Sequence, residues 1–479
     1  MVARLIVISN RVAVPENASE ASAGGLAVAV QAALSGRDGI WFGWSGRVAE
    51  ETEHELTTHK VGGTTYVVLD LSQDDYNEYY SGFANRVLWP ILHYRLDLAE
   101  FTRSDLSGYQ RVNNHFADRL SKILRPDDVV WVHDYHLMPL AKLLRERGHQ
   151  NRIGYFLHVP CPPPDILTAL PKHRDVVGAL TAFDLIGLQT ENDCDNLGRY
   201  LISQGAFRSP DIHRLEAHNR TVRLGAFPVG IETDRFEKLA RRAAATTLIK
   251  ETKDSLGGRA LVMSVDRLDY SKGLPNRMDA IERFLSSYPE WHERITFLQI
   301  APKSRAQIQE YMDIDRQVST LAGQINGRHG EVTWTPIRYV NRAYSRTALA
   351  GLYRLAKVGL VTPLRDGMNL VAKEYVAAQD PADPGVLVLS QFAGAADELD
   401  GALIVNPHEP EAVAGAIRFA LEMPLEARKY RHQRMLAILR ASDIRKWTTR
   451  FLSTLEQPIP DRQTETHTLG ANLSVDMRN

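Results

Sequence analysis

Polar and charged residues follow five of the apolar runs of this chain, at the point where each run ends. HDYH, residues 133–136, comes directly after VVWV, and His158 comes directly after YFL. In the second half of the chain, DRLDYSK, APKSR and LRDG follow apolar runs in the same way. A single cluster of this kind is weak evidence, because charged loop residues are usually solvated. Five of them at the same end of successive strands indicate one functional site.

The positive charges among these residues indicate the kind of ligand. Arg11, Arg267, Lys272 and Arg305 all lie at predicted strand ends, although the formal net charge of the chain is −1. Cationic groups gathered in a cleft favour anionic ligands such as phosphates. The alternative is that they form structural ion pairs with neighbouring acids, and for Asp269 we favour that alternative.

A glycine pair, Gly24 and Gly25, lies at the start of the predicted helix GGLAVAVQAAL. Such a pair lets backbone N–H groups approach a ligand at a helix N-terminus, although an ordinary turn explains it equally well. The chain contains neither G-x-G-x-x-G nor G-x-x-x-x-G-K-[ST]. Nicotinamide-dependent and P-loop functions are therefore disfavoured.

The residues at the strand ends disfavour two other chemistries, a metal site and a cysteine nucleophile. His133 and His136 lie three residues apart with no obvious third ligand, which argues against a metal site. Cys161 lies near His158, as in a nucleophile–base pair, but nothing in CPPP lowers the pKa of its thiol. We therefore expect Cys161 to be a buried structural residue.

The aromatic segment YYSGFANRVLWPILHY, residues 79–94, has the pattern of a helix that mostly packs in a core. Tyr80 and Trp89 can instead face a cleft, where sugar rings stack on aromatic faces. Spacing alone leaves both alternatives open.

Short apolar runs alternate with amphipathic segments along the whole chain, which predicts an α/β fold with parallel sheets covered on both faces. Strands are expected at 4–9, 65–71, 128–133, 153–160, 183–190, 222–230, 260–268, 295–302, 358–363, 385–392 and 402–407. Helices are expected at 24–34, 137–148, 191–203, 274–288, 345–356 and 409–423.

The alternation restarts after Gly230 and the basic, alanine-rich stretch 241–258, which marks a domain boundary. We predict two doubly wound, Rossmann-like domains, 1–235 and 236–450, that face each other across a cleft holding the active site. Residues 451–479 would form a helix crossing back to the first domain and a mobile polar tail.

Length and composition agree with this organisation. The chain has 479 residues, too many for one ordinary core, with 44% apolar and 24% charged residues. No run of 18 apolar residues occurs, and the first apolar run, LIVIS, is too short for a signal peptide. Two cysteines argue against a disulfide framework and fit a reducing cytoplasm.

Long stretches of the chain resemble the bacterial trehalose-6-phosphate synthases, glucosyltransferases of the GT-B fold. The resemblance runs from ISNRVAVP to about residue 455. It includes SAGGLAV, WFGWSG, FANRVLWPILHYR, VWVHDYHLMPL, GYFLHVP, GLQTENDCDNL, PVGIE, DRLDYSKGLPNR, TPLRDGMNLVAKEYVAAQ and VLSQFAGAADEL. Collinear matches of this length are far more specific than a short motif.

The resemblance implies transfer of glucose from UDP-glucose to glucose 6-phosphate, which gives α,α-trehalose 6-phosphate and UDP, the first step of trehalose biosynthesis in stress protection. The anomeric configuration would be retained, and neither a metal nor a cofactor would be needed. No enzyme nucleophile would act; the leaving diphosphate would take the acceptor proton. Nucleic acid and membrane are not expected as partners. A homo-oligomer, dimer or tetramer, and a separate downstream phosphatase are expected.

The same resemblance assigns the site residues. The acceptor phosphate and sugar would be held by Arg11, Tyr80, Trp89, Asp134 and Arg305. The donor would contact Gly24 and Gly25, His158, Arg267, Lys272, Tyr344, Asp366, the backbone of Gly367, Met368, Asn369, Leu370 and Val371, and Glu374. Asp134, His158, Arg267, Lys272 and Asp366 would serve catalysis. No role follows for Arg365.

Three alternatives remain open at this stage. One is a relative that uses another phosphorylated acceptor, such as glycerol 3-phosphate or a cyclitol phosphate. A second uses ADP- or GDP-glucose as donor, because backbone contacts rather than side chains select the base. The third is a catalytically silent sugar-phosphate sensor, which is disfavoured because Arg267, Lys272 and Asp366 are all present.

Overall fold

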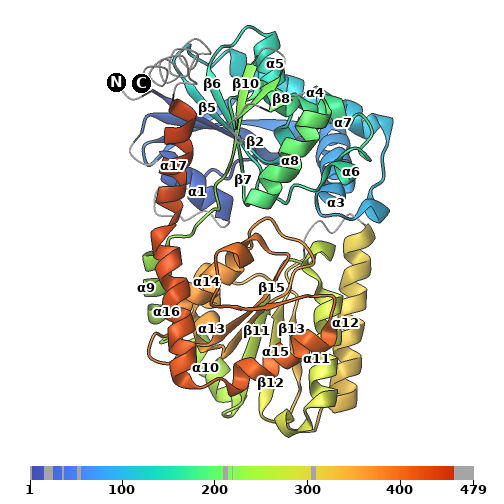
Figure 1. Ribbon diagram of the computed structural model, residues 1–479, viewed down its shortest axis with the longest axis vertical. Coiled ribbons are helices and arrows are strands. Elements are labelled where there is room, and N and C mark those ends of the chain that lie inside the picture. Colours follow the sequence, from blue (N-terminus) through green and yellow to red (C-terminus); the bar gives the residue numbers. More distant parts are fainter. Residues whose placement is uncertain are drawn as a thin grey trace, which may run out of the picture.

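The computed structural model describes residues 3–15, 25–34, 37–50, 55–205, 207–208, 214–217, 220–303 and 309–457. Two lobes are stacked along the long axis of the molecule, and each is built around one sheet (Figure 1). Gly24, Arg305 and the tail after Gln457 lie outside the described residues. Within the described part of the chain, every helix is too short or too polar to cross a membrane.

The N-terminal sheet has the order β3-β4-β2-β1-β5-β6-β7-β10-β9-β8. Its strands are β1 (Leu5–Arg11), β2 (Gly39–Ala49), β3 (Thr57–Val61), β4 (Thr64–Ser72), β5 (Val129–His133), β6 (Arg152–Phe156), β7 (Leu185–Leu188), β8 (Phe207–Arg208), β9 (Arg214–Ala217) and β10 (Arg220–Ala226). β3, β8 and β9 pair antiparallel at the two edges, and the central strands pair parallel. β1 lies between β2 and β5, so the strand order reverses there.

The C-terminal sheet has the order β13-β12-β11-β14-β15-β16, and all its strands pair parallel. Its strands are β11 (Ala260–Val265), β12 (Ile295–Ile300), β13 (Ile337–Val340), β14 (Val358–Val361), β15 (Val386–Ser390) and β16 (Leu403–Val405). Counted within the domain this is 3-2-1-4-5-6, the doubly wound order of dinucleotide-binding folds. The predicted fold class is confirmed.

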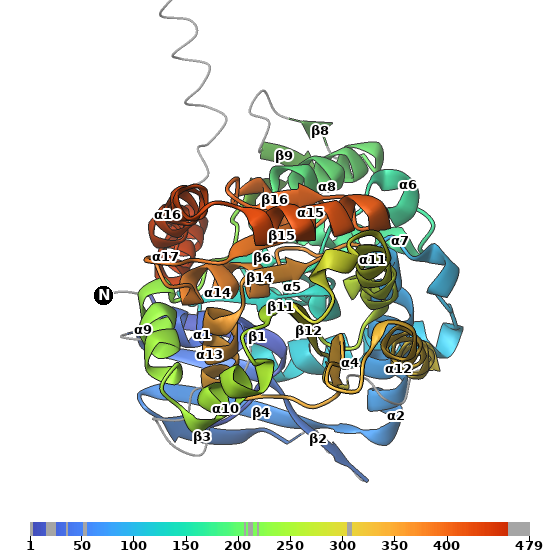
Figure 2. The ribbon, with the colours of Figure 1, turned by 90° about the horizontal axis from the view of Figure 1, so that it is seen from below.

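Helices cover both faces of each sheet, as the alternation predicted. The helices of the first lobe are α1 (Gly25–Leu34), α2 (Gln73–Asp75), α3 (Trp89–Leu92), α4 (Arg103–Ser121), α5 (Leu140–Glu146), α6 (Pro164–Leu167), α7 (His173–Val176) and α8 (Glu191–Ser203). Those after it are α9 (Thr233–Ala243), α10 (Thr247–Leu256), α11 (Leu274–Ser287), α12 (Gln309–His329), α13 (Arg346–Leu355), α14 (Leu370–Ala378), α15 (Pro410–Glu422), α16 (Leu425–Ala441) and α17 (Ile444–Glu456). α11, α12 and α15 pack on one face of the C-terminal sheet, and α9, α13 and α14 pack on the other (Figure 2).

The aromatic segment is helical, as predicted, but its first part is wound with π geometry. This π-helix, η1, spans Tyr76–Leu88 and leads directly into α3. Apolar spacing does not distinguish i→i+5 from i→i+4 hydrogen bonding, so the pattern gave no sign of it. Most of the segment is buried, with Tyr79 and Phe83 at 0% exposure.

Two chain crossings, side by side, join the lobes. Residues 227–232 lead from β10 into α9, and the basic stretch that marked the boundary forms α9 and α10 rather than a linker. The second crossing, between α16 and α17, lies directly against the first. A Cβ on Gly230 of the first crossing would lie 2.1 Å from the Ser442 carbonyl oxygen of the second. α17 then packs on the first lobe beside α1 (Figure 1), where the Phe451 ring stacks on Trp131 at 4.6 Å.

Candidate functional site

The carboxyl ends of β5, β6 and β7 in the first lobe and of β11 and β14 in the second contribute residues to one site between the lobes. A cavity of about 590 Å³ lies there, lined by side chains of both domains and by the first crossing. Ligands of doubly wound sheets bind at such switch points. The predicted site residues that line it are Asp134, His158, Arg267, Lys272, Tyr344, Asp366, Met368, Asn369, Leu370, Val371 and Glu374. Another cavity, of about 510 Å³, adjoins the C-terminal end of α4 and contains none of them.

A short ion pair marks the C-terminal side of the cavity. Lys272 Nζ lies 2.5 Å from Asp366 Oδ2, and the Asn369 side-chain amide donates to the same oxygen at 3.0 Å. Asn369 adopts φ 76° and caps α14, because its Oδ1 accepts the Ala372 N–H at 3.1 Å. The positive end of the α14 dipole and a cation therefore adjoin the same carboxylate, an arrangement suited to an anionic ligand.

Gly367 is the point where the two domains touch at this end of the cavity. A Cβ at residue 367 would lie 2.3 Å from the His158 carbonyl oxygen, so only glycine permits this approach. Gly367 itself lies behind the cavity wall, while its neighbours Asp366 and Met368 line it. Gly367 thus allows the loop between β14 and α14 to contact the segment that follows β6.

Glu374 lies one turn into α14, with its side chain 20% exposed. Burial raises its pKa from 4.5 to about 7, and the positive charge of Arg346 acts in the opposite direction. Arg346 Nε lies 3.8 Å from Glu374 Oε1, and another guanidinium nitrogen lies 3.7 Å from Glu232. Tyr344 lines the same end of the cavity and accepts a hydrogen bond from Arg342.

Arg267 projects toward the other domain. Its guanidinium carbon lies 5.6 Å from the ring centroid of Trp89, within cation–π range. It lies 4.0 Å from Asp269, a fully buried carboxylate that accepts hydrogen bonds from the Ser271 N–H and hydroxyl. The Trp89 indole N–H also points to Asp269, at 3.4 Å. Asp269 therefore has the structural role that its sequence context favoured.

On the N-terminal side, two histidines form a neutral pair. His133 Nδ1 and His158 Nε2 are 3.0 Å apart. Burial lowers the pKa of His158 to about 3 and lowers that of His133 well below its usual value. Both rings are therefore uncharged at neutral pH, and His158 can hydrogen-bond a hydroxyl group without adding charge to the cavity.

Asp134 leaves β5 in a strained backbone conformation, with φ 74°. Its Oδ1 accepts the His158 N–H at 3.3 Å, and its own N–H donates to the Phe156 carbonyl at 2.8 Å. A non-glycine residue in this region persists only where its surroundings fix it, and such residues gather at functional sites. The strain directs the Asp134 carboxylate to the cavity.

Three predicted acceptor residues, Arg11, Tyr80 and Trp89, are not among the residues that line the cavity. Arg11, exposed at the end of β1, has its guanidinium 6.0 Å from the Trp44 ring centroid. Tyr80 packs on the same indole at 5.5 Å and stacks on His136. Trp44 therefore brings Arg11 and Tyr80 together. Trp89 joins the site through its contacts with the C-terminal domain.

Some predicted residues are not placed. Gly24 and Arg305 lie outside the described residues, and Gly25 is the first residue of α1. Cys161 is buried, and burial raises the pKa of its thiol, so the structural role expected for it is confirmed.

Several lining residues were not identified as site residues from the sequence. Gln189 accepts the Val229 N–H at 3.1 Å and so fixes the crossing against the end of β7. Asp266 forms a buried pair with Arg277 at 2.8 Å, and Glu232 meets Arg346. The motif PVGIE at the first crossing could have indicated part of this lining, because a chain that passes between two domains borders the cleft between them.

The chain was compared with known proteins. The model of glycosyltransferase family 20 matches residues 3–457. A trehalose-6-phosphate synthase of Sinorhizobium fredii is 51% identical over 454 residues, which covers 94% of this chain and 98% of the relative.

Solved structures agree with this match. A UDP-forming α,α-trehalose-phosphate synthase from Burkholderia xenovorans, in complex with glucose-6-phosphate, superposes with a TM-score of 0.91 at 48% identity, covering 95% of this chain and all of that one. An E. coli structure, described as trehalose-6-phosphate bound with UDP-2-fluoro glucose, gives a TM-score of 0.91 at 47% identity, with 96% and 100% coverage.

Proposed function

The chain belongs to glycosyltransferase family 20, and from that premise we propose that it transfers glucose from UDP-glucose to glucose 6-phosphate, giving trehalose 6-phosphate and UDP. The observation that carries the proposal is the interdomain cavity in which the Lys272–Asp366 pair adjoins the N-terminus of α14. Relatives of nearly equal length, solved with glucose-6-phosphate and with a UDP-glucose analogue, support the two substrates.

The donor is assigned to the C-terminal side. The diphosphate would lie between Lys272, Arg267 and the first N–H groups of α14, where cations and the helix dipole favour negative charge. Asp366 and His158 would hold glucose hydroxyls, and Glu374 would accept from the ribose hydroxyls. Along a helix at ~1.5 Å per residue, Glu374 lies about 7 to 8 Å beyond Asn369, roughly the step from a phosphate to its ribose.

The acceptor is assigned to the N-terminal side. Arg11 and Tyr80, which pack on the same tryptophan, would bind the phosphate together with Arg305, and Trp89 would border the sugar. Asp134 would accept a hydrogen bond from an acceptor hydroxyl. The acceptor would thereby lie across the cavity from the donor glucose.

The chemistry proposed is direct transfer with retention. The bond between the anomeric carbon and the diphosphate oxygen breaks, the acceptor hydroxyl attacks the same face, and its proton passes to the departing diphosphate. Lys272 and Arg267 stabilise the negative charge that grows on the leaving group. The two histidines are uncharged, so neither donates a proton as imidazolium. In this account the cationic side chains and the helix N-terminus supply the charge, without a metal ion.

The compartment proposed is the cytoplasm. Cys161 and Cys194 are both free and buried, which fits a reducing environment.

An assay of UDP release tests the proposal. UDP-glucose, ADP-glucose and GDP-glucose would each be offered with glucose 6-phosphate, glycerol 3-phosphate and no acceptor. We expect release with UDP-glucose and glucose 6-phosphate, unchanged after a chelator is added. Tight ligand binding without release from any donor would instead identify a sensor, and preference for another pair would identify a related transferase.

A further inference from the structure

Arg365 precedes Asp366 in the loop between β14 and α14. The sequence alone predicts no role for this residue. Its guanidinium carbon lies 4.1 Å from the ring centroid of Tyr94 and 4.8 Å from that of Phe392. Phe392 follows β15 in the C-terminal domain, whereas Tyr94 belongs to the turn after α3 in the N-terminal domain. Arg365 is therefore held between one ring of each domain.

Tyr94, the partner of Arg365 in the N-terminal domain, has an energetically unfavourable backbone conformation. Tyr94 adopts φ 65°, which is rare for a bulky residue. Its N–H donates to the Ile91 carbonyl at 3.0 Å, so the turn that closes α3 fixes it. Burial raises the pKa of Tyr94 to about 12, and the positive charge of Arg365 opposes that shift. Backbone strain thus presents this ring to the other domain.

The C-terminal end of the contact is rigid. The N–H groups of Leu364 and Arg365 both point to the Ser271 carbonyl, at 2.8 and 3.3 Å, and the Asp366 N–H donates to the Phe392 carbonyl at 3.0 Å. Asp366 in turn pairs with Lys272. Arg365 is therefore connected to Asp366 and Lys272 through the backbone of this loop, its hydrogen bonds and one ion pair.

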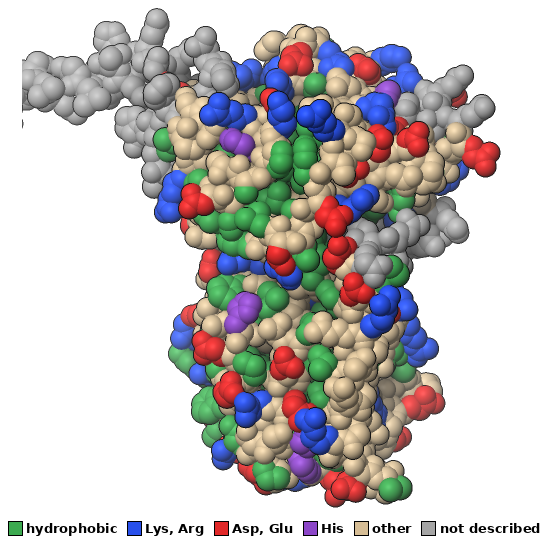
Figure 3. Space-filling view, turned by 90° about the vertical axis from the view of Figure 1, so that its right-hand side faces the viewer, with side chains coloured by type: hydrophobic (Ala, Val, Ile, Leu, Met, Phe, Trp, Pro, Cys, Tyr) green, Lys and Arg blue, Asp and Glu red, His purple; other side chains and the backbone are tan. Residues whose placement is uncertain are grey.

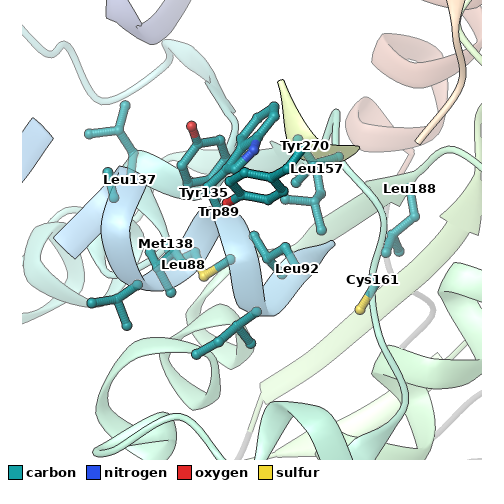
Figure 4. Packing of buried hydrophobic residues seen from close by; sticks show 14 of the residues in the cluster. Leu88, Trp89, Leu92, Tyr135, Leu137, Met138, Leu157, Cys161, Leu188 and Tyr270 are labelled. Atoms are coloured by element: carbon teal, nitrogen blue, oxygen red, sulfur yellow. The ribbon is translucent and has the colours of Figure 1, made fainter. Parts of the chain in front are cut away.

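The same N-terminal segment, residues 89–95, makes further contacts across the cleft. Trp89 meets Asp269 and Arg267, as described above, and Arg95 lies 5.6 Å from the Tyr270 ring centroid. Figure 4 shows Tyr270 beside Trp89 in the packed cluster that includes Leu92 and Tyr135. Aromatic and cationic groups of both domains thus interdigitate at this place.

This contact lies on the opposite side of the molecule from the two crossings. In Figure 1, α16 and α17 run along the left edge, and α3 lies on the right above α12. Figure 3 looks onto the α3 side, where the lobes meet at a waist with hydrophobic and charged side chains. The crossings join the lobes covalently, whereas residues 89–95 join them only through side chains. Hinge motion about the crossings would break the latter contacts first.

We propose that Arg365 and Tyr94 form a latch that closes the two domains over the substrates, so that Arg365 is a positioning residue for the transfer. The stack joins the loop that carries Asp366 to the turn after α3, so it holds the two domains together on this side of the molecule. It stabilises the state in which Asp366 and Lys272 face the acceptor side. The proposal rests on the transferase function stated above.

A double-mutant cycle tests the latch. Arg365→Ala and Tyr94→Leu should each lower kcat/KM by about tenfold, the size expected of a desolvated cation–π contact. The double variant should lose no more than either single variant, because both remove the same contact. Tyr94→Phe, which keeps the ring, should restore most of the activity, and Arg365→Lys should recover only part, because an ammonium lacks the planar stacking surface.

Arg418→Ala is the matched control. Arg418 stacks on Tyr288 at 4.9 Å within the C-terminal domain, away from the cavity, so its loss should leave kcat/KM unchanged. Small-angle scattering with UDP and glucose 6-phosphate supplies a readout beside activity. Arg365→Ala should have a larger radius of gyration than the wild type, at an unchanged melting temperature.

Losses that simply multiply in the double variant, or equal radii of gyration, would overturn the latch. If the wild type itself released no UDP, the proposed function would fail, while the scattering comparison would still decide whether the latch exists.

Discussion

The two walls of the cavity differ in charge: the C-terminal wall contains ion pairs, whereas the N-terminal wall contains few charged groups. On the C-terminal side, charged groups face one another in pairs, Lys272 with Asp366 and Arg346 with Glu374. On the N-terminal side the cavity is bordered by the uncharged ring of His158 and by one strained carboxylate, Asp134, with aromatic side chains beyond. A buried cation without a partner is costly, and Asp366 supplies a partner for Lys272. In the proposed function, the C-terminal wall would exchange the Lys272–Asp366 ion pair for contacts with a diphosphate, and the N-terminal wall would position hydroxyl groups.

The strongest test of this contrast removes Lys272. Lys272→Ala should lower kcat by ~10² to 10³, because the charge it supplies is needed most as the diphosphate departs. The affinity for glucose 6-phosphate, measured by calorimetry, should stay close to that of the wild type. Lys357→Ala is the control, since it removes an equally short ion pair, to Asp383 at 2.5 Å, on the surface of the same domain. A loss of acceptor affinity in Lys272→Ala would show that the two walls are not separate.

Arg11 tests the acceptor wall. Arg11→Ala should raise the KM for glucose 6-phosphate by about 10- to 100-fold, the loss expected for one charged hydrogen bond, with little change in kcat or in the KM for UDP-glucose. Steady-state kinetics with each substrate varied in turn separates these constants. Arg305→Ala should act in the same way.

Arg47→Ala is a matched control for Arg11. Arg47 lies on the neighbouring strand β2 and pairs with Asp70 at the surface. Its removal should change neither KM. If Arg11→Ala weakened the donor instead of the acceptor, the assignment of the walls would have to be reversed.

A smaller effect is expected from pH at Glu374. Burial raises its pKa from the usual 4.5 to about 7, so the side chain is half protonated near neutrality. In the proposed complex, ribose hydroxyls would donate to the carboxylate and favour its ionised form. The affinity for UDP-glucose should therefore rise with pH and level off above pH 7, with a change of about three- to tenfold between pH 6 and 8.

UDP-glucose is the right probe for this measurement, because its diphosphate has no group that titrates near pH 7. Glu374→Gln removes the ionisable group and should make the affinity independent of pH over this range. A pH dependence that survives in Glu374→Gln would assign the titration to another residue.

Prediction from the sequence succeeded where one pattern corresponds to one geometry. The alternation of strands and helices predicted the parallel strands at the centre of both sheets but not the antiparallel edge strands β3, β8 and β9, and ENDCDNLGRYLIS coincides with α8. The end of the strand before TPLRDGMNL was predicted, and β14 ends at Val361. Gly367 was expected to contact the donor, whereas the structure places it against the His158 carbonyl, behind the cavity wall. Local patterns suffice for a helix such as α8, because its backbone hydrogen bonds join residues about four positions apart.

Contacts between distant segments could not be predicted in this way. The Arg365–Tyr94 contact joins residues of different domains, and neither side chain has a local sign of it. The Lys272–Asp366 pair spans 94 positions of sequence and depends on the order of β11 and β14 in the sheet. The π geometry of η1 and the neutral state of the His133–His158 pair follow from packing, which spacing does not record.

The most direct test of the account follows a labelled glucose through the reaction by NMR. UDP-[1-¹³C]glucose and glucose 6-phosphate would be incubated with the protein, and omission of the acceptor would serve as the blank. The account predicts that the label moves into a non-reducing disaccharide phosphate in which it keeps the small H1–H2 coupling of an α-glucoside, with UDP formed in equal amount. A label that stays on UDP, appears as free glucose or emerges in a β-linkage would contradict it.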